Sequence, residues 1–227
     1  MKREVTLEEI SDGNLYREND MVKVCADCKG CSACCKGMGH SLVLDPYDVH
    51  RLRIGLLQME EYKDMAADFT HMLSVLELNL TDGLILPNMK MDGEQEQCPF
   101  LNEEGRCKVH SHRPGICRLF PLGRYYEEDE FYYILQVHEC KKKSTLKVKV
   151  KKWLSQDNLG AYNDYIRTWH RLKKHMEQQV AQAESHEQMK QITMGLLNEF
   201  YVKNYDEDRD FFTQFDERVN QNGALAK

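Results

Sequence analysis

Five cysteines lie within eleven residues, in the stretch CADCKGCSACC at residues 25–35. Four of them follow a strict three-residue step, and the fifth comes directly after the last of the four. They are Cys25, Cys28, Cys31, Cys34 and Cys35. Thiolates bind soft or borderline metals, and a Cys-x-x-Cys step lets two sulfurs converge on one centre. This stretch therefore predicts a metal site.

More cysteines follow over sixty residues later and bring the total to nine. Cys98, Cys107 and Cys117 lie in CPFLNEEGRCKVHSHRPGICRLFP, which is rich in turn-forming glycine and proline, and Cys140 follows a predicted hairpin. Such turns bring backbone close to a buried metal and leave amide groups available to sulfur. We therefore expect this second segment to complete the site.

Nine thiols exceed the four ligands of a single zinc. Two four-sulfur centres would use eight thiols, and a multinuclear cluster with bridging thiolates would also fit. In either case we expect Cys34 and Cys35 to serve different metals, because adjacent side chains diverge. The repeated three-residue step and the Cys-Pro at 98–99 resemble iron–sulfur proteins, whereas separated pairs of ligands are typical of zinc. Both cofactors, an iron–sulfur cluster or zinc, stay open.

Cationic residues accompany the second segment. Two four-thiolate centres would carry net negative charge with either metal, and buried negative charge needs partners. We expect Arg113 and Arg118 to surround the centre in this role. Cys25 and His110 are additional candidate ligands, because both lie beside the other cysteines in sequence.

The composition limits partners and compartment. The 227 residues are 41% hydrophobic, as in a typical globular protein, and the net charge of −6 gives no general reason to expect nucleic-acid binding. The lysine-rich run at 141–152 has no interleaved aromatic residues, so we interpret it as a solvated face. No apolar stretch resembles a signal peptide or a membrane span. We therefore expect a cytoplasmic protein with reduced thiols, no membrane partner and no disulfide framework.

The remaining patterns predict an α+β fold. We expect an irregular cysteine-rich metal-binding domain with short strands and helices, followed by a helical C-terminal part. The predicted boundaries are an N-terminal extension at 1–24, the metal-binding domain at 25–143 and a helical region at 144–227 packed on it.

Local signals place several elements. Asp45 is a good N-cap for a helix that begins at Pro46. A short strand is predicted at 41–44, another helix within 60–76, and hairpins around Asp82–Gly83 and within 122–137. Apolar residues at steps of three and four predict one long helix and two shorter ones in the C-terminal part. Their apolar residues are Leu159, Tyr162, Ile166, Trp169, Leu172, Met176 and Val180, then Met189, Ile192, Leu196 and Phe200, then Phe212, Phe215 and Val219.

The motifs CKGCSACC, CPFL and C-x2-H-x2-RP-x2-CR-x-FP, read in that order, resemble the CxxCxxCC zinc- or iron-chelating family of YkgJ-type cysteine cluster proteins. The resemblance covers roughly residues 25–140 and implies a metal-chelating domain. It implies eight ligand positions: Cys28, Cys31, Cys34, Cys35, Cys98, Cys107, Cys117 and Cys140. The chain departs from the pattern at Cys25, which is an extra cysteine, and at His110, which stands where the family usually has tyrosine.

Three functions are compatible with these observations. The first is a metal-chelating protein that acts in metal handling or electron transfer. The second is a lysine N-methyltransferase, because one branch of the family contains flagellin N-methylases; KGMGH at 36–40 is only a weak candidate for a methyl-donor turn. The third is a structural zinc module that presents the C-terminal helices to a protein partner and folds only with metal. No hydrolase or phosphate-binding motif is present in the sequence.

Overall fold

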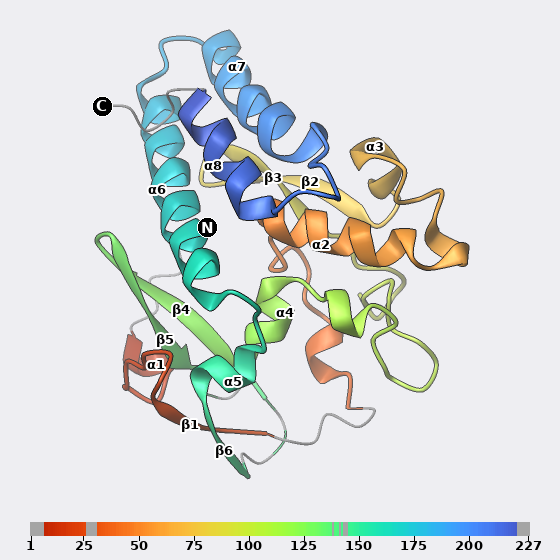
Figure 1. Ribbon diagram of the computed structural model, residues 1–227, viewed down its shortest axis with the longest axis vertical. Coiled ribbons are helices and arrows are strands. Elements are labelled where there is room, and N and C mark those ends of the chain that lie inside the picture. Colours follow the sequence, from red (N-terminus) through yellow and green to blue (C-terminus); the bar gives the residue numbers. More distant parts are fainter. Residues whose placement is uncertain (1–6, 26–30, 138, 141, 143–144, 222–227) are drawn as a thin grey trace. The chain divides into compact units, whose positions relative to one another are not determined.

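The computed structural model describes residues 7–25, 31–137, 139–140, 142 and 145–221 (Figure 1). The chain forms two compact units, and each is built from two separate stretches of sequence. The thiol unit comprises Met1–Gly39 and Met91–Leu159, and the aromatic unit comprises His40–Lys90 and Gly160–Lys227. Helices mix with short antiparallel strand pairs, and the C-terminal part is helical, which confirms the predicted α+β class. The predicted division into three sequential segments stays a prediction.

The thiol unit contains two antiparallel strand pairs and short helices. Strand β1 (Met21–Val24) pairs with β6 (Leu146–Lys149), and β4 (Leu122–Glu127) pairs with β5 (Glu130–Leu135). Its helices are α1 (Leu7–Ile10), α4 (Gly115–Leu119) and α5 (Val150–Leu154), with 3-10 turns η1 (Ala33–Cys35) and η3 (His110–His112). Between β1 and β6 the two valines Val22 and Val148 face each other, and so do Lys23 and Lys147.

The aromatic unit contains the longer helices. Its elements are α2 (Pro46–Leu57), η2 (Glu60–Tyr62), α3 (Phe69–Met72), β2 (Leu76–Thr81), β3 (Leu84–Met89), α6 (Leu159–Gln182), α7 (His186–Leu197), the π-helix η4 (Asn198–Val202) and α8 (Phe211–Gln221). Strands β2 and β3 form an antiparallel pair. Within this unit, α8 lies between α6 and α7 (Figure 1).

Sequence signals explain where these elements begin. The backbone N–H of Asp48 donates to the Asp45 carboxylate at 2.8 Å, and the Asp45 N–H donates back to Asp48 at 3.3 Å, which forms a capping box at the start of α2. The turn between β2 and β3 uses positive φ angles at Asp82 and Gly83, 49° and 86°, as tight hairpins require. The predicted helix start and this hairpin are confirmed.

Interlocking aromatic rings form the core of the aromatic unit. Tyr165 lies at its centre, with ring centroids 4.7 Å from Phe215 and 5.4 Å from Phe211. Two buried tyrosines also bond to backbone: Tyr47 N donates to the Tyr165 hydroxyl at 3.1 Å, and the Tyr201 hydroxyl donates to Leu44 O at 3.0 Å. The predicted amphipathic helices therefore pack as a core.

Two predicted elements are shorter than expected. The predicted strand at 41–44 is reduced to a bridge between Val43 and Asn88, next to Pro87, which has no N–H to extend a ladder. The predicted helix within 60–76 consists of the short η2 and α3. Among the described residues, none of the helices combines the length and apolar character that a membrane crossing demands.

Candidate metal centre

Eight of the nine cysteines lie among the described residues, and all eight belong to the thiol unit. None of these eight forms a disulfide. Cys28, a predicted ligand, lies outside the described residues. The remaining cysteines fall into two groups, according to which thiols act on one another.

The five-thiol group joins two segments that are distant in sequence. It comprises Cys34, Cys35, Cys98, Cys107 and Cys117. The turn η1 carries Cys34 and Cys35, and Cys98 N donates to Cys35 O at 2.8 Å. Cys107 forms a β-bridge with Leu101, three residues after Cys98, so the second segment folds back on itself. Cys117 lies on α4.

The thiols of this group shift one another's pKa values through hydrogen bonds and charge. The Cys34 thiol donates a hydrogen bond to Cys35, which raises the pKa of Cys34 and lowers that of Cys35. Burial and then negative charge at Cys98, Cys117 and Cys107 oppose the lowering of the Cys35 pKa. These interactions show that the five sulfurs share one region of the thiol unit.

Burial keeps other thiols of this group in the neutral form. It raises the pKa of Cys98 to about 11, against backbone hydrogen bonding near Phe100. It also raises the pKa of Cys107, against the positive charge of Arg113. A buried thiolate without a cation is unfavourable, so each of these sulfurs would gain from a nearby positive ion.

A three-thiol group comprises Cys25, Cys31 and Cys140. Cys25 directly follows β1 and is only 4% exposed. Burial raises the pKa of Cys140, and the charge and hydrogen bond of Cys25 and the charge of Cys31 raise it further. The β1–β6 pairing continues past the strand end, because Thr145 N donates to Val24 O at 3.0 Å, and this brings the chain near Cys140 close to Cys25.

The predicted arginine and histidine residues differ in their surroundings and in how they relate to the five-thiol group. Arg113 lowers the pKa of Cys34 and of Cys107, so its charge reaches the five-thiol group. Its Nε donates to His110 O at 3.2 Å, and His110 itself is exposed. Arg118 is buried on α4 and donates from Nη1 to the side chain of Gln156.

The donor chemistry fits zinc or iron. Within the described ranges, no three Cys, His, Asp or Glu side chains stand in an arrangement ready to hold a metal ion. Thiols instead bond to one another, as Cys34 does to Cys35. These thiols nevertheless gather in a partly buried region, where a soft or borderline cation can displace their protons. Thiolates gathered in this way are the donors that zinc and iron use in proteins.

An α+β fold with two clusters of thiols in one unit defines a cysteine-cluster protein. Residues 27–146, more than half of the chain, match the CxxCxxCC family, whose description reads "Putative zinc- or iron-chelating domain". The chain therefore belongs to the CxxCxxCC family. Comparison with curated proteins and with solved structures gives no match.

Spacing alone did not reveal the grouping of the thiols. Cys25 and Cys31 lie close to Cys34 in sequence, yet they interact with Cys140, more than a hundred residues later. The signal for this lies in the pairing of β1 with β6, which the sequence analysis did not predict. The assignment of Cys34 and Cys35 to different metals stays a prediction.

Proposed function

We propose that this protein chelates zinc or iron through thiolates at two separate centres of the thiol unit. The observation that carries the proposal is the convergence of cysteines from two distant segments into the five-thiol group. The three-thiol group would form the second centre, with Cys28 as the ligand that the family pattern adds. The five-thiol group has one thiol more than a single zinc takes, so one of its cysteines is spare unless that centre holds more than one metal. Cys34 and Cys35 would then belong to one group, unlike the expectation that they serve different metals.

Binding would reverse the preference of these thiols for their neutral form. A thiol must lose its proton to ligate, so metal binding releases protons and weakens at low pH. Bound zinc would supply a rigid cross-link between the segments, and a bound iron–sulfur cluster would add electron transfer. The chain's own residues supply the sulfurs, and the hydrogen bond from Cys98 N to Cys35 O links the two segments.

We assign Arg113 and Arg118 to the surroundings of the five-thiol group. Supporting observations are the effect of Arg113 on two thiols and the position of Arg118 next to Cys117 on α4. A guanidinium group offers several N–H donors to partly negative sulfurs. We also place the protein in the cytoplasm, where thiols stay reduced.

The first experiment counts metal in protein purified without air. Zinc, iron and acid-labile sulfide are measured per chain, together with an absorption spectrum. Matching iron and sulfide with a band near ~400 nm identify a cluster, and colourless protein with zinc identifies a zinc protein. Protein that retains neither metal, even after anaerobic reconstitution with each, contradicts the proposal.

A pair of variants tests the two centres against each other. Cys107→Ser should reduce the metal of the five-thiol group and leave that of the three-thiol group in place. Cys140→Ser should do the reverse, so each variant is the control for the other. Equal loss of all metal in both variants would show a single joint centre.

Arginine variants test the assigned surroundings. Arg113→Leu and Arg118→Leu should lower metal affinity. Arg167→Leu, at a half-buried arginine of α6 that pairs with Asp164 at 3.1 Å in the other unit, should not. Full metal affinity in both thiol-unit variants would remove these arginines from the proposal.

A further inference from the structure

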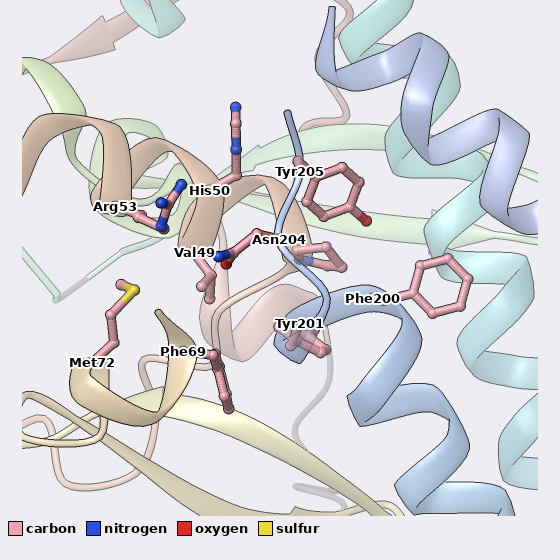
Figure 2. A pocket seen from close by; sticks show the side chains of 10 residues that line it. Val49, His50, Arg53, Phe69, Met72, Phe200, Tyr201, Asn204 and Tyr205 are labelled. Carbon is pink, nitrogen blue, oxygen red and sulfur yellow. The ribbon is translucent and has the colours of Figure 1, made fainter. Parts of the chain in front are cut away.

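A pocket of the aromatic unit is lined by both apolar and polar side chains. It lies between α2, α3 and the π-helix η4 with the residues that follow it (Figure 2). Apolar side chains that line it include Val49, Phe69 and Met72. Asn204 and Arg53 both line it, and Figure 2 shows their polar ends on the same side of the pocket, near Val49. Nothing in the sequence had singled out this region.

Arg53 has hydrogen-bonding capacity that its protein partners do not use. Its Nη1 pairs with the Glu207 carboxylate at 2.8 Å. Its Nε is buried and makes no hydrogen bond to the described residues, and none is found for Nη2. Because Nε and Nη2 share one edge of the planar guanidinium, this edge is a fork of two parallel N–H donors.

Charged groups of both signs act on the residues that line the pocket. His50, another lining residue, is partly buried, and burial followed by the charges of Arg53, Arg218 and Arg51 lowers its pKa to about 4. The imidazole is therefore neutral at physiological pH. Glu207 compensates Arg53 on its Nη1 side. Burial, followed by the negative charges of Asp45 and Asp48, raises the pKa of the lining residue Tyr201, so charges of both signs act on the pocket.

One wall of the pocket is held by a buried arginine. Arg218 donates to the carbonyl oxygens of Glu199, Lys203 and Asn204 at 2.6, 2.8 and 2.8 Å. Its guanidinium carbon lies 3.6 Å from the centroid of the Tyr205 ring. These contacts fix the backbone that carries Asn204, which comes two residues after the π-helix η4. Such helices are frequent at functional sites.

We propose that this pocket binds a small oxyanion, a carboxylate or phosphate group, through Arg53 and Asn204. The two N–H donors of the fork can both bond to one entering oxygen of such a group. The Asn204 side-chain amide, which makes no hydrogen bond to the described residues, supplies a further donor. The enclosed space is about 10 Å³, room for about one water-sized group, so the anion enters with one oxygen and the rest stays at the mouth.

Calorimetric titration of the metal-loaded protein tests this site. Sodium acetate and sodium phosphate are the probes, with sodium chloride at equal ionic strength as the background. Wild-type protein should bind one of the two oxyanions at one site per chain. Acetate as the tighter ligand identifies a carboxylate site, and phosphate as the tighter ligand identifies a phosphate site.

Variants separate a specific site from general attraction. Arg53→Gln should weaken binding at least about tenfold, the effect of losing a charged hydrogen bond. Arg167→Gln removes the same charge from a half-buried arginine of α6 that does not line the pocket, and it should leave binding unchanged. Asn204→Ala keeps every charge and should weaken binding less than Arg53→Gln does, which keeps the test decisive if Arg53→Gln fails to fold.

Three results would overturn the proposal. The first is that neither oxyanion shows saturable binding. The second is that Arg53→Gln and Arg167→Gln weaken oxyanion binding equally. The third is that the Arg53→Gln variant and the Asn204→Ala variant both bind the oxyanion with unchanged affinity. Because the pocket residues all belong to the aromatic unit, failure here leaves the proposed thiolate centres untouched.

Discussion

The two units of this chain achieve stability by different physical means. The aromatic unit buries a continuous set of rings, and its helix α6 alone spans 24 residues. In the thiol unit, the helices α1, α4 and α5 have only four or five residues each. Helices this short and isolated two-stranded hairpins are marginal in water. The thiol unit therefore needs another source of stability, which bound metal would provide.

The sharpest test of this difference is removal of the metal. A structural zinc contributes about 10–16 kcal/mol to the folding of a small domain, so chelation should unfold the thiol unit. The chain has two tryptophans, and each reports on one unit. Trp153 donates from Nε1 to Leu119 O at 3.1 Å within the thiol unit, and Trp169 is buried in the aromatic unit.

Single-tryptophan variants make this measurement specific. With Trp169→Phe, the emission of Trp153 should shift to longer wavelength when a chelator is added. With Trp153→Phe, the emission of Trp169 should stay constant under the same conditions. A shift of both reporters at the same chelator concentration would show that the two units unfold together, against the comparison.

The next largest effect is expected in the opposite unit. Phe215 is fully buried, 4.7 Å from the Tyr165 ring and 5.5 Å from the Phe200 ring. Phe215→Ala should cost about 3–5 kcal/mol of unfolding free energy, because it leaves a cavity among these rings. Urea unfolding followed by Trp169 measures the loss, and metal content should not change. Asn220→Ala, at an exposed position of the same helix, is the control.

Acid should weaken the aromatic unit through His50. Its pKa is about 4 in the folded chain, because of burial and nearby arginines, and 6.5 is the ordinary value that the unfolded chain keeps. As pH falls below about 6.5, the unfolded state binds the proton first, so the unfolding free energy drops until about pH 4, by at most about 3 kcal/mol. Urea unfolding of the Trp153→Phe protein across this range measures the slope.

A histidine substitution identifies the group responsible. His50→Gln should flatten the pH dependence between pH 6.5 and about 4. His71→Gln, at an exposed histidine of α3 in the same unit, should leave it as in the parent protein. An unchanged slope in His50→Gln would assign the acid sensitivity elsewhere.

The smallest expected effect is a gain of stability in the thiol unit. Lys23 and Lys147 lie directly opposite each other on β1 and β6, and like charges at this position are unfavourable. Lys23→Glu should raise the unfolding free energy by about 0.2–1 kcal/mol. Lys147→Glu should do the same, whereas the double variant restores a like-charged pair and should lose the gain. Equal stability of all four proteins would mean that this ribbon does not limit the thiol unit.

Sequence and structure agree where the signal is local. The capping residues Asp45 and Asp48, the Asp82–Gly83 turn and the periodicity of α6 each act within a few residues, so their elements were predicted correctly. The membership of 40–90 in one unit with 160–227 depends on contacts between distant segments, and no local pattern encodes it. The same holds for the partition of the cysteines and for the pocket beside η4, since both arise only when separate segments meet.

The interleaved order of the two units has a consequence for synthesis on the ribosome. The thiols up to Cys35 are made roughly sixty residues before Cys98, and at about 5–20 residues per second this leaves several seconds without their later partners. During that interval the next residues made, 40–90, belong to the aromatic unit, which is completed only after residue 160. The first five thiols of the nascent chain are therefore made before the segments that complete either unit.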